Sequence, residues 1–550
     1  MNEETNTELE NLISECILSF SENQKQKDML VAGVSSILGK PFKLKHEKAP
    51  HVSIDTFIDL LTNFNEKESR QKHNGVFYTP KDVTSFITYN AFINYVFPEN
   101  TCVFNTSSAK DHLFDLPERI NRKVLKTTVF DPTCGNGEFL ISAFLLKYSI
   151  LKKSKNKVLD ADIYNIVASI HANDIEESAI RISKIRLFFL AVSLIKNVAY
   201  SKKIAQVLND HFLNNDFVIF DYTKFSHYDI ILGNPPYVEY RQLLKRPNND
   251  FGNCYADVLV NCSELLNSNG VMSFIIPLSY VSTPRMQKLR EKLSEVLGKQ
   301  FVLNYADRPD CLFTSVHQKL TILIGRKQTR NKAVFSSSYF YWYKSERNKL
   351  FDEISVSQIT WNDLNYLPKL GSEIENNIFT KTLTRDKSQS LLAASLTEGS
   401  SVFLNMRGCF WMKAFTFNPG SNEYREYCFD SKYTSYIHCL LNSSLFFFFW
   451  IATSDCWHIT QKELGSFLLK PIEHDQVTVF DTLSKELENM LEKTKVYVGT
   501  KQVEYEYKHK DCKSVIDKID RELQHIYNLT DDELSFIINF NIKYRMSDGQ

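Results

Sequence analysis

The sequence has little that points to metal binding, secretion or membrane insertion. Its 11 cysteines include no Cys-x-x-Cys pair, so neither a zinc site nor a disulfide framework is indicated. The N-terminal residues lack the basic and apolar pattern of a signal peptide. The longest fully apolar run, Leu445–Ala452, is far too short to span a bilayer, and we expect it to form a core helix or strand. These absences predict a protein of the reducing cytoplasm with no membrane partner.

A net charge is also absent, because 65 basic residues balance 65 acidic ones. The chain therefore has no global basic bias of the kind that marks many nucleic-acid-binding proteins. A local basic cleft stays compatible with this balance, since only a docking face needs to neutralise phosphates. The chain does have length and apolar content: 550 residues, of which 43% are hydrophobic, predict large cores and more than one domain.

The most informative stretch is Asn234-Pro235-Pro236-Tyr237, which follows the apolar run Tyr228–Gly233. The run predicts a buried strand, and the prolines end it because they offer no N–H group to a sheet. Ligands bind at the carboxyl ends of strands in open α/β sheets. An exocyclic amino group needs two acceptors, which the Asn234 side chain and the Pro235 carbonyl could supply, and a planar base needs a stacking face such as Tyr237. A strand followed by a Pro-Pro turn is the structural alternative.

A second motif, Val129–Phe144, predicts a strand, a glycine-containing turn and a helix. Glycines allow a close approach of the backbone to a ligand, and the N-terminus of the following helix favours an anionic group. The turn differs from the dinucleotide fingerprint Gly-x-Gly-x-x-Gly, and a lone Gly-x-Gly is common in α/β proteins for packing reasons. The residues of this turn that we expect to line a cofactor are Asp131, Pro132, Cys134, Gly135 and Gly137.

The two motifs resemble those of amino-group DNA methyltransferases, which use S-adenosylmethionine, and most closely the gamma class, which methylates adenine N6. That class has a methionine-side motif, a glycine loop, Asn-Pro-Pro-Tyr and a target recognition domain, in this order. The resemblance covers roughly the middle half of the chain. It implies an α/β fold with a doubly wound, Rossmann-like methyltransferase sheet. It also implies double-stranded DNA as a partner, and it leaves room for a separate restriction endonuclease.

The resemblance assigns further cofactor residues. The Phe-Tyr-Thr-Pro element of the family matches Tyr78, Thr79 and Pro80, which would pack against the methionine end of the cofactor. Asp174, followed by Ile175, would accept hydrogen bonds from both ribose hydroxyls. The structural alternatives are a simple turn for Thr79-Pro80 and a helix N-cap for Asp174.

The adenine of the cofactor would meet Asp216, which would accept from its amino group, and Phe217, which would stack on its face. Asp221 is a competing choice for the acidic residue, although its sequence context fits the family less well. The structural alternative for Phe217 is a place in the hydrophobic core.

The same resemblance implies a mechanism. The target adenine would leave the duplex stack, and its amino group would donate to Asn234 and to the carbonyl of Pro235, held rigid by Pro236. Tyr237 would stack on the base and Phe313 would press on it from another side, with a core role as the alternative for Phe313. Catalysis would consist of positioning and electrostatic stabilisation, without a covalent enzyme intermediate.

The patterning predicts three regions. Residues 1–70 form an N-terminal helical extension, and residues 71–328 form the methyltransferase domain, with a final strand at Lys319–Gly325. Residues 329–550 form an α+β target recognition domain that ends in helices, with a helix-capping signal at Thr530–Glu533. Every cofactor and catalytic motif lies in the middle region, so the last region is expected to select the DNA sequence.

Other functions remain as alternatives. Cytosine also carries an exocyclic amino group, and Asn-Pro-Pro methylases of RNA or protein exist; Tyr237 and the long C-terminal region favour adenine in DNA. A bifunctional restriction endonuclease–methylase needs a Pro-Asp…Asp/Glu-x-Lys metal site, and Pro309-Asp310 is not followed by a clean Glu-x-Lys. A modification or specificity component, or a non-catalytic DNA-binding protein, would keep the fold without turnover. The basic stretch 240–246 would contact phosphates or simply be solvated.

Overall fold

The structure of the chain is a computed structural model. The structure describes residues 3–46, 52–62, 79–155, 157–197, 199–219, 221–240, 251–313, 317–329, 332–361, 363–500 and 504–547. Two expectations fall outside these ranges: the role of Tyr78 in the methionine-side motif, and phosphate contacts by the basic residues that follow Tyr240.

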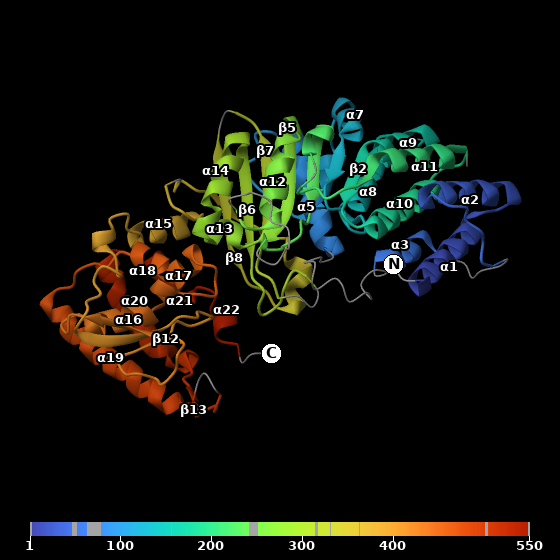
Figure 1. The fold of residues 1–550 in the computed structure, drawn as a ribbon. Helices are drawn as coiled ribbons and strands as arrows, with labels where there is room; N and C mark the ends of the chain where they lie inside the picture. Colours follow the sequence, from blue (N-terminus) through green and yellow to red (C-terminus); the bar gives the residue numbers. More distant parts are fainter. Residues whose placement is uncertain are drawn as a thin grey trace.

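The centre of the molecule is a nine-stranded mixed sheet in the order β3-β2-β1-β4-β5-β7-β6-β8-β9 (Figure 1). Its strands are β1 (Val129–Asp131), β2 (Ile170–Asp174), β3 (Phe212–Asn214), β4 (Tyr228–Gly233), β5 (Leu266–Pro277), β6 (Leu297–Tyr305), β7 (Leu320–Lys327), β8 (Ala333–Phe340) and β9 (Val356–Gln358). The first five strands in this order are parallel, whereas β7 runs antiparallel to both β5 and β6. The prediction of a largely parallel, doubly wound sheet is therefore confirmed.

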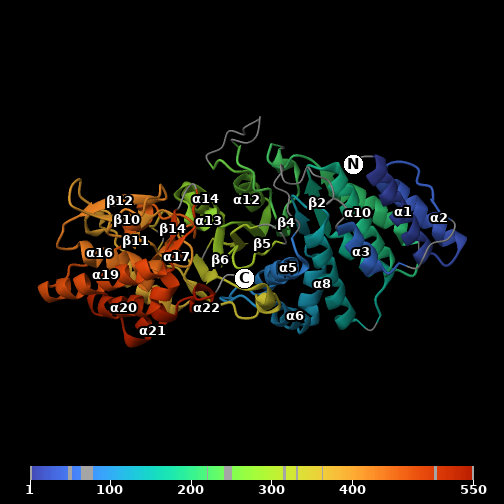
Figure 2. The same ribbon diagram turned by 90° about the horizontal axis from the view of Figure 1, so that it is seen from below.

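Helices cover both faces of the sheet (Figures 1 and 2). Helix α5 (Lys81–Val96) packs on β4, β5 and β7 from one side, while α12 (Cys254–Glu264) and α14 (Gln287–Val296) pack on the other. A strand that is covered by helices on both faces needs apolar side chains on both faces. The centre of β4 is accordingly the apolar run Ile230-Ile231-Leu232. The other helices of this part are α6 (Thr106–Phe114), α7 (Glu118–Lys126), α8 (Glu138–Ser154), α9 (Asp160–Ala168), α10 (Glu177–Val192), α11 (Ala199–His211) and α13 (Ser279–Ser282), with 3₁₀ turns η1 (Tyr222–Lys224), η3 (Pro284–Met286) and η4 (Lys344–Lys349).

Three N-terminal helices form, as predicted: α1 (Glu3–Phe20), α2 (Gln24–Leu38) and α3 (Ile54–Thr62). They pack against α10 and α11, and the ring of Phe57 meets that of Phe189 edge to face at 5.0 Å. These helices share one hydrophobic core with the glycine turn and with α8 and α10. A second, larger core joins the remaining sheet to the C-terminal region.

The C-terminal region is α+β, as expected. A three-stranded antiparallel sheet, in the order β11-β10-β12, lies among helices. Helix α21 begins with the predicted capping box, in which Thr530 and Glu533 each bind the backbone of the other residue. The elements are α15 (Glu373–Thr382), η5 (Lys387–Gln389), β10 (Ser400–Asn405), β11 (Ala414–Phe415), β12 (Tyr424–Phe429), α16 (Thr434–Asn442), α17 (Ser444–Thr453), α18 (Gln461–Ser466), α19 (His474–Thr494), β13 (Val496–Tyr497), β14 (Tyr505–Glu506), η6 (His509–Cys512), α20 (Lys513–Tyr527), α21 (Asp531–Asn539) and α22 (Ile542–Arg545).

The apolar run Leu445–Ala452 lies within α17, whose residues are all buried, so the expected core helix is confirmed. Among the described residues, no single helix is both long enough and apolar enough to cross a membrane. Helices α16 and α17 reach that length and composition only as a pair, and they meet at an angle of 62°.

One expectation about the sheet is wrong. The strand at Lys319–Gly325 is not the final one, because β8 pairs in parallel with β6 and β9 pairs with β8. The aromatic run that begins at Ser338 therefore starts inside the central sheet rather than in a separate recognition domain. The predicted domain boundary at residue 328 falls between β7 and β8, and cutting there would leave β6 as an exposed edge strand, paired only with β7.

Candidate active site

Asn234 follows the carboxyl end of β4, where the order of the sheet reverses between β1 and β4. Its Nδ2 donates to Oγ1 of Thr79 at 3.1 Å, and Thr79 is buried. This bond fixes the rotation of the amide group. The structure thus brings together Asn234 and the Thr79-Pro80 pair, which are 155 residues apart in the chain.

Tyr237 is held by its hydroxyl group, which donates to the carbonyl of Ile275 in β5 at 2.9 Å. Burial raises the pKa of this phenol well above its ordinary value, so the hydroxyl stays protonated. The ring remains partly exposed, whereas Pro235 is buried. The tetrapeptide therefore presents an amide, a rigid backbone and an anchored aromatic ring at one sheet edge.

The glycine turn lies directly beside Asn234. Thr133 Oγ1 donates to the carbonyl of Asn234 at 3.4 Å. Gly135 has φ +50° and Gly137 has φ +85°, and these left-handed conformations favour glycine. A Cβ atom built on Gly135 would meet nothing within 4 Å, so this backbone faces open space. A ligand can therefore approach the turn closely at Gly135.

Asp174 ends β2 and supports the turn from the neighbouring strand. Its carboxylate accepts from the backbone N–H of Gly135 at 2.8 Å and from that of Glu176 at 2.9 Å. Helix α10 begins only at Glu177, with Glu176 as its N-cap, so Asp174 is not the helix N-cap. Ile175, the next residue, exposes 62% of its surface, which is unusual for a large apolar side chain beside a buried strand.

Asp131 ends β1 and is buried, and burial raises the pKa of its carboxyl group well above the ordinary value. It accepts from the backbone N–H of Thr133 at 3.1 Å. A Cβ atom on Gly233 would stand 3.1 Å from Oδ1 of Asp131 and 3.0 Å from the ring of Phe274. Glycine at position 233 therefore lets β4 approach β1 closely, just before Asn234.

The remaining predicted cofactor residues fall into two environments. Asp216 is half-buried and accepts from the backbone of Val218 at 3.0 Å. Phe217, only 3% exposed, packs among core rings that include Phe130 and Phe225, so its position is that of the core alternative.

Asp221, the competing choice for the acidic residue, is exposed and caps the turn η1 through Thr223. Pro132 and Cys134 are buried below the turn.

Phe313 is 1% exposed and belongs to the large hydrophobic core. It lies in the connection between β6 and β7, and in this structure it has the position of the core alternative. Among the described residues, no group of three or more His, Cys, Asp and Glu side chains could hold a metal ion.

Sequence reasoning missed two polar residues that tie the site together. Asn173 is buried, and its Nδ2 donates to the carbonyl groups of Pro132 and Asn215, at 3.0 and 2.9 Å. It thereby joins the turns that follow β1, β2 and β3. Arg186 of α10 is fully buried and pairs with Glu138 of α8 at 2.7 Å. Only the position of Asn173 next to Asp174 could have drawn attention to it from the sequence.

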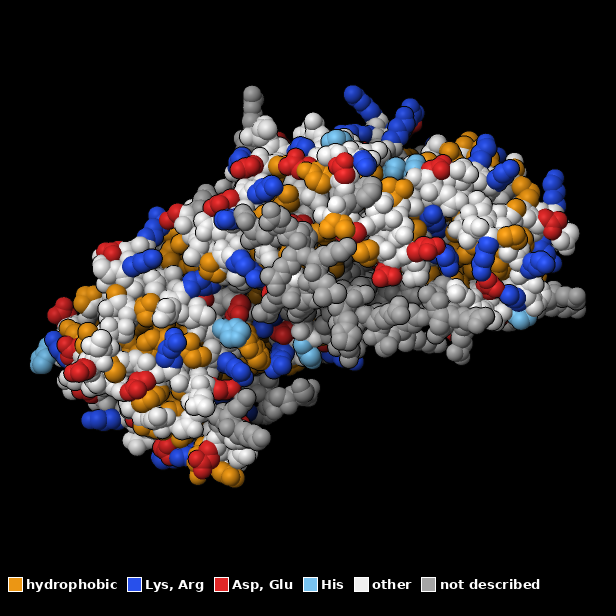
Figure 3. Space-filling model, in the orientation of Figure 1, with side chains coloured by type: hydrophobic (Ala, Val, Ile, Leu, Met, Phe, Trp, Pro, Cys, Tyr) orange, Lys and Arg blue, Asp and Glu red, His pale blue; other side chains and the backbone are white. Residues whose placement is uncertain are grey.

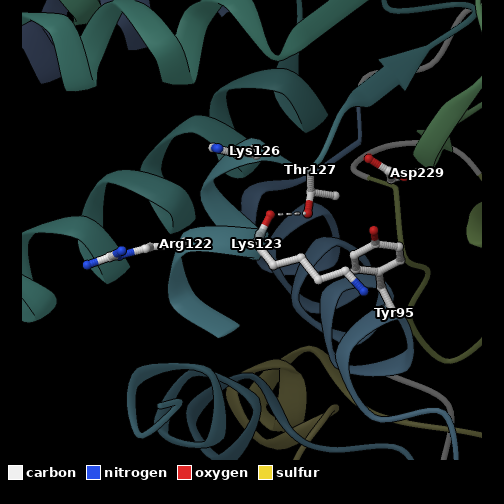
Figure 4. Close-up of a pocket in the computed structure, with 6 residues that line it drawn as sticks. All are labelled: Tyr95, Arg122, Lys123, Lys126, Thr127 and Asp229. Carbon is white, nitrogen blue, oxygen red and sulfur yellow. Dashed lines mark hydrogen bonds between the residues drawn. The ribbon is translucent and has the colours of Figure 1, made fainter. Parts of the chain in front are cut away.

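A separate pocket of about 340 Å³ lies at the opposite edge of the sheet (Figure 4). Thr127 and Asp229 in its wall stand just before β1 and near the start of β4. Asp229 accepts from the backbone N–H of Thr128 at 2.9 Å, and the ammonium group of Lys123 lies over the ring of Tyr95 at 4.8 Å. The polar groups of this pocket thus join β1 to β4 and lie away from Asn234.

The central part of the chain is similar to a known protein family. Residues 168–308 match the family model of the Eco57I restriction-modification methylase. This stretch is an Eco57I-type restriction-modification methylase domain. It contains β2, β3, β4 and Asn234, and the methyl donor of such a methylase is S-adenosylmethionine.

Two curated relatives are similar over part of their length. Modification methylase CviBIII of Paramecium bursaria Chlorella virus NC1A is 23% identical over 246 residues, which are 44% of this chain and 48% of the relative. A putative type II restriction enzyme and methyltransferase of Methanocaldococcus jannaschii is 29% identical over 155 residues, 24% of this chain and 13% of the relative. The chain thus matches about half of the first relative and far less of the second.

One solved structure is similar over almost the whole chain. The Type IIL restriction-modification enzyme MmeI, solved in complex with DNA, superposes with a TM-score of 0.53 at 12% identity, covering 98% of this chain and 90% of that one. At this identity the likeness shows the fold alone. The predicted fold class is confirmed.

Proposed function

We propose that this protein is a site-specific DNA methyltransferase that transfers a methyl group from S-adenosylmethionine to adenine N6. The observation that carries the proposal is the placement of Asn234. Its amide is fixed by Thr79 at the switch point of the sheet, and the glycine turn touches its backbone. We further propose that it acts on double-stranded DNA within a restriction–modification or related defence system in the cytoplasm, where its eleven free cysteines would stay reduced.

The residues of the glycine turn fit S-adenosylmethionine. The open space above Gly135 leaves room for a ligand, and the free lone pairs of the Asp174 carboxylate can accept ribose hydroxyl groups. The exposed side chain of Ile175 can cover one face of a planar ring, and Asp216 can accept from a ring amino group. When bound, S-adenosylmethionine supplies the activated methyl group.

On the target side, Asn234 and Pro235 act as acceptors. The Asn234 side-chain oxygen and the Pro235 carbonyl would each take one N–H bond of the adenine amino group. Two fixed acceptors favour a pyramidal nitrogen and aim its lone pair at the methyl group, so these residues position the nucleophile without bonding to it covalently. Tyr237, anchored through Ile275, offers a ring on which the flipped base can stack.

The adenine assignment is tested by the product. Purified protein, S-adenosylmethionine carrying a labelled methyl group, and DNA should yield N6-methyladenine on digestion to nucleosides. N4-methylcytosine as the labelled product would contradict adenine specificity while keeping the methylase. Label in neither base, with intact cofactor binding, would favour a non-catalytic DNA-binding component.

We propose that the C-terminal region chooses the DNA sequence. It lies beside the edge of the sheet beyond β8 (Figure 1), and both basic and acidic side chains are scattered over the face seen in Figure 3. The alternative is a bifunctional restriction endonuclease–methylase, suggested by the name of the Methanocaldococcus relative, of which 13% is matched. Cleavage of unmethylated DNA with magnesium would support that alternative. A purely modifying enzyme would work beside a separate endonuclease.

We expect cofactor affinity to fall about tenfold between pH 7 and pH 5. Burial raises the pKa of Asp174 to about 6, so its carboxylate is ionised at pH 7 and mostly protonated at pH 5. Protonation occupies a lone pair that the ribose hydroxyls need, so affinity is lost as the pH falls through the pKa. Calorimetric titration at both pH values checks this expectation. The variant Asp174→Asn should bind weakly with little pH dependence, and equal wild-type affinity at both pH values would contradict the role of Asp174.

A further inference from the structure

Arg347 joins the segment that leads to the proposed target-base site to a segment of the hydrophobic core. Its guanidinium group forms a two-pronged pair with Asp82, with Nε 2.6 Å from Oδ2 and the second contact at 3.0 Å. The same group donates to the backbone carbonyls of Cys311 and Leu312, at 3.1 and 3.0 Å. Four hydrogen bonds from one planar group fix both segments in one arrangement, because the guanidinium fork is rigid.

One segment leads directly to a residue of the proposed site, and the other leads to the core residue Phe313. Asp82 is the second residue of α5, which starts after Thr79-Pro80, and Thr79 orients the amide of Asn234. Cys311 and Leu312 come immediately before Phe313. A displacement of Arg347 would therefore shift the start of α5, and with it the Thr79 hydroxyl that orients the amide of Asn234.

Arg347 is itself tied to the C-terminal region. It belongs to η4, whose Glu346 pairs with Lys543 of α22 and accepts from the hydroxyl of Tyr544 at 3.2 Å. Tyr343 donates from its hydroxyl to the carbonyl of Lys543 at 3.2 Å. Figure 2 shows the segment after β8, in yellow, between α5 and α22. The contacts of Arg347 are thus continuous with those of the last helix.

We propose that Arg347 is a positioning residue for the target base: it ties the start of α5 to the core segment before Phe313 and thereby fixes Thr79 and the amide of Asn234. This inference rests on the proposed function. The pair with Asp82 is partly exposed, with side-chain exposures of 24% and 40%, so it contributes little to folding as an isolated ion pair. Its role lies in placement, and small misplacements of reacting groups cost large factors in rate.

The test compares Arg347→Met, Arg347→Lys and a matched control, Arg385→Met. Arg385 forms an equivalent pair with Asp363, at 2.8 and 3.0 Å, on the exposed surface. Two DNA duplexes carry the recognition site, found beforehand by methylation-sensitive sequencing: one keeps the target adenine and serves for the rates, and the other has 2-aminopurine in its place and serves for the fluorescence. The rise in 2-aminopurine fluorescence reports the flipped base, and steady-state rates and calorimetry give kcat, KM for DNA and the cofactor Kd.

We expect Arg347→Met to lower kcat by on the order of tenfold to a hundredfold and to lose most of the fluorescence rise. The cofactor Kd should change much less than kcat, because the proposed ribose contact lies on Asp174 beside the glycine turn rather than at the start of α5. Lysine keeps the charge but cannot make all four bonds, so Arg347→Lys should recover only part of the rate. Arg385→Met should behave as the wild type.

Two results would overturn the inference. One is wild-type kcat and fluorescence in Arg347→Met. The other is an equal loss of cofactor affinity and kcat, which would mean general damage. If Arg347→Met does not fold, Asp82→Asn removes one side of the pair at the exposed start of α5 and must show the same selective loss of kcat. A wild-type protein that methylates no DNA would instead refute the proposed function.

Discussion

Replacing Asn234 by alanine should lower the rate of methyl transfer on the order of a hundredfold or more, because one preorganised acceptor for the target amino group is lost. Cofactor affinity should stay within about twofold, since the glycine turn touches only the backbone carbonyl of Asn234. Single-turnover methyl transfer and calorimetric cofactor titration measure the two effects separately.

Asn539→Ala serves as the matched control for this prediction. Asn539 lies on the exposed side of α21, where its amide donates to the carbonyl of Ser535 at 2.8 Å. Asn234→Asp keeps an acceptor oxygen facing the base and should retain more activity than Asn234→Ala. Near-normal transfer by Asn234→Ala would remove Asn234 from the mechanism.

Replacing Asp174 by alanine should weaken the binding of S-adenosylmethionine on the order of a hundredfold, because two hydrogen bonds to a charged acceptor together contribute about 3 kcal/mol. The same change frees the backbone N–H of Gly135, which loosens the turn. Gly135→Val should weaken binding by another route, since its side chain would enter the open space above the turn and strain a backbone with φ +50°.

Asp115→Ala is the matched control for the acidic residue. Asp115 forms an exposed surface ion pair with Lys153 at 2.8 Å, and such pairs contribute little. If Asp174→Ala and Gly135→Val both bind the cofactor as the wild type does, the pocket lies elsewhere. If Asp174→Ala binds the cofactor normally and Gly135→Val does not, the proposed contact between Asp174 and the ribose is wrong.

The local parts of the fold were predictable from the sequence, because strand, turn and helix signals are encoded within a few residues. The end of the apolar run before Asn234 marks the end of β4, and the glycines after Asp131 mark the end of β1. The position of β7 between β5 and β6 was not predictable, since it depends on pairing between strands distant in sequence. The same holds for β8, which pairs with β6 and carries three consecutive serines, a residue type that does not mark a strand.

The residues of the candidate site also fall into two groups: those that a local sequence pattern reveals and those that depend on contacts between distant residues. Motif residues such as Asn234 and Asp174 are recognisable because their chemistry is tied to a short pattern. The bond between Asn234 and Thr79 and the four bonds of Arg347 join residues from 35 to 265 positions apart, so no local pattern reveals them. The aromatic residues Phe217 and Phe313 show the converse, because a ring suited to stacking is equally suited to a core.

The two hydrophobic cores bear on how the protein responds to heat. The glycine turn belongs, through Cys134 and Leu140, to the core shared with the N-terminal helices, whereas β4 and β5 belong to the core shared with the C-terminal region. A ligand that binds only the folded turn stabilises the core beneath it by mass action. Saturation with cofactor would therefore protect the N-terminal helices against melting more than the C-terminal ones, so that one polypeptide behaves as two cooperative units.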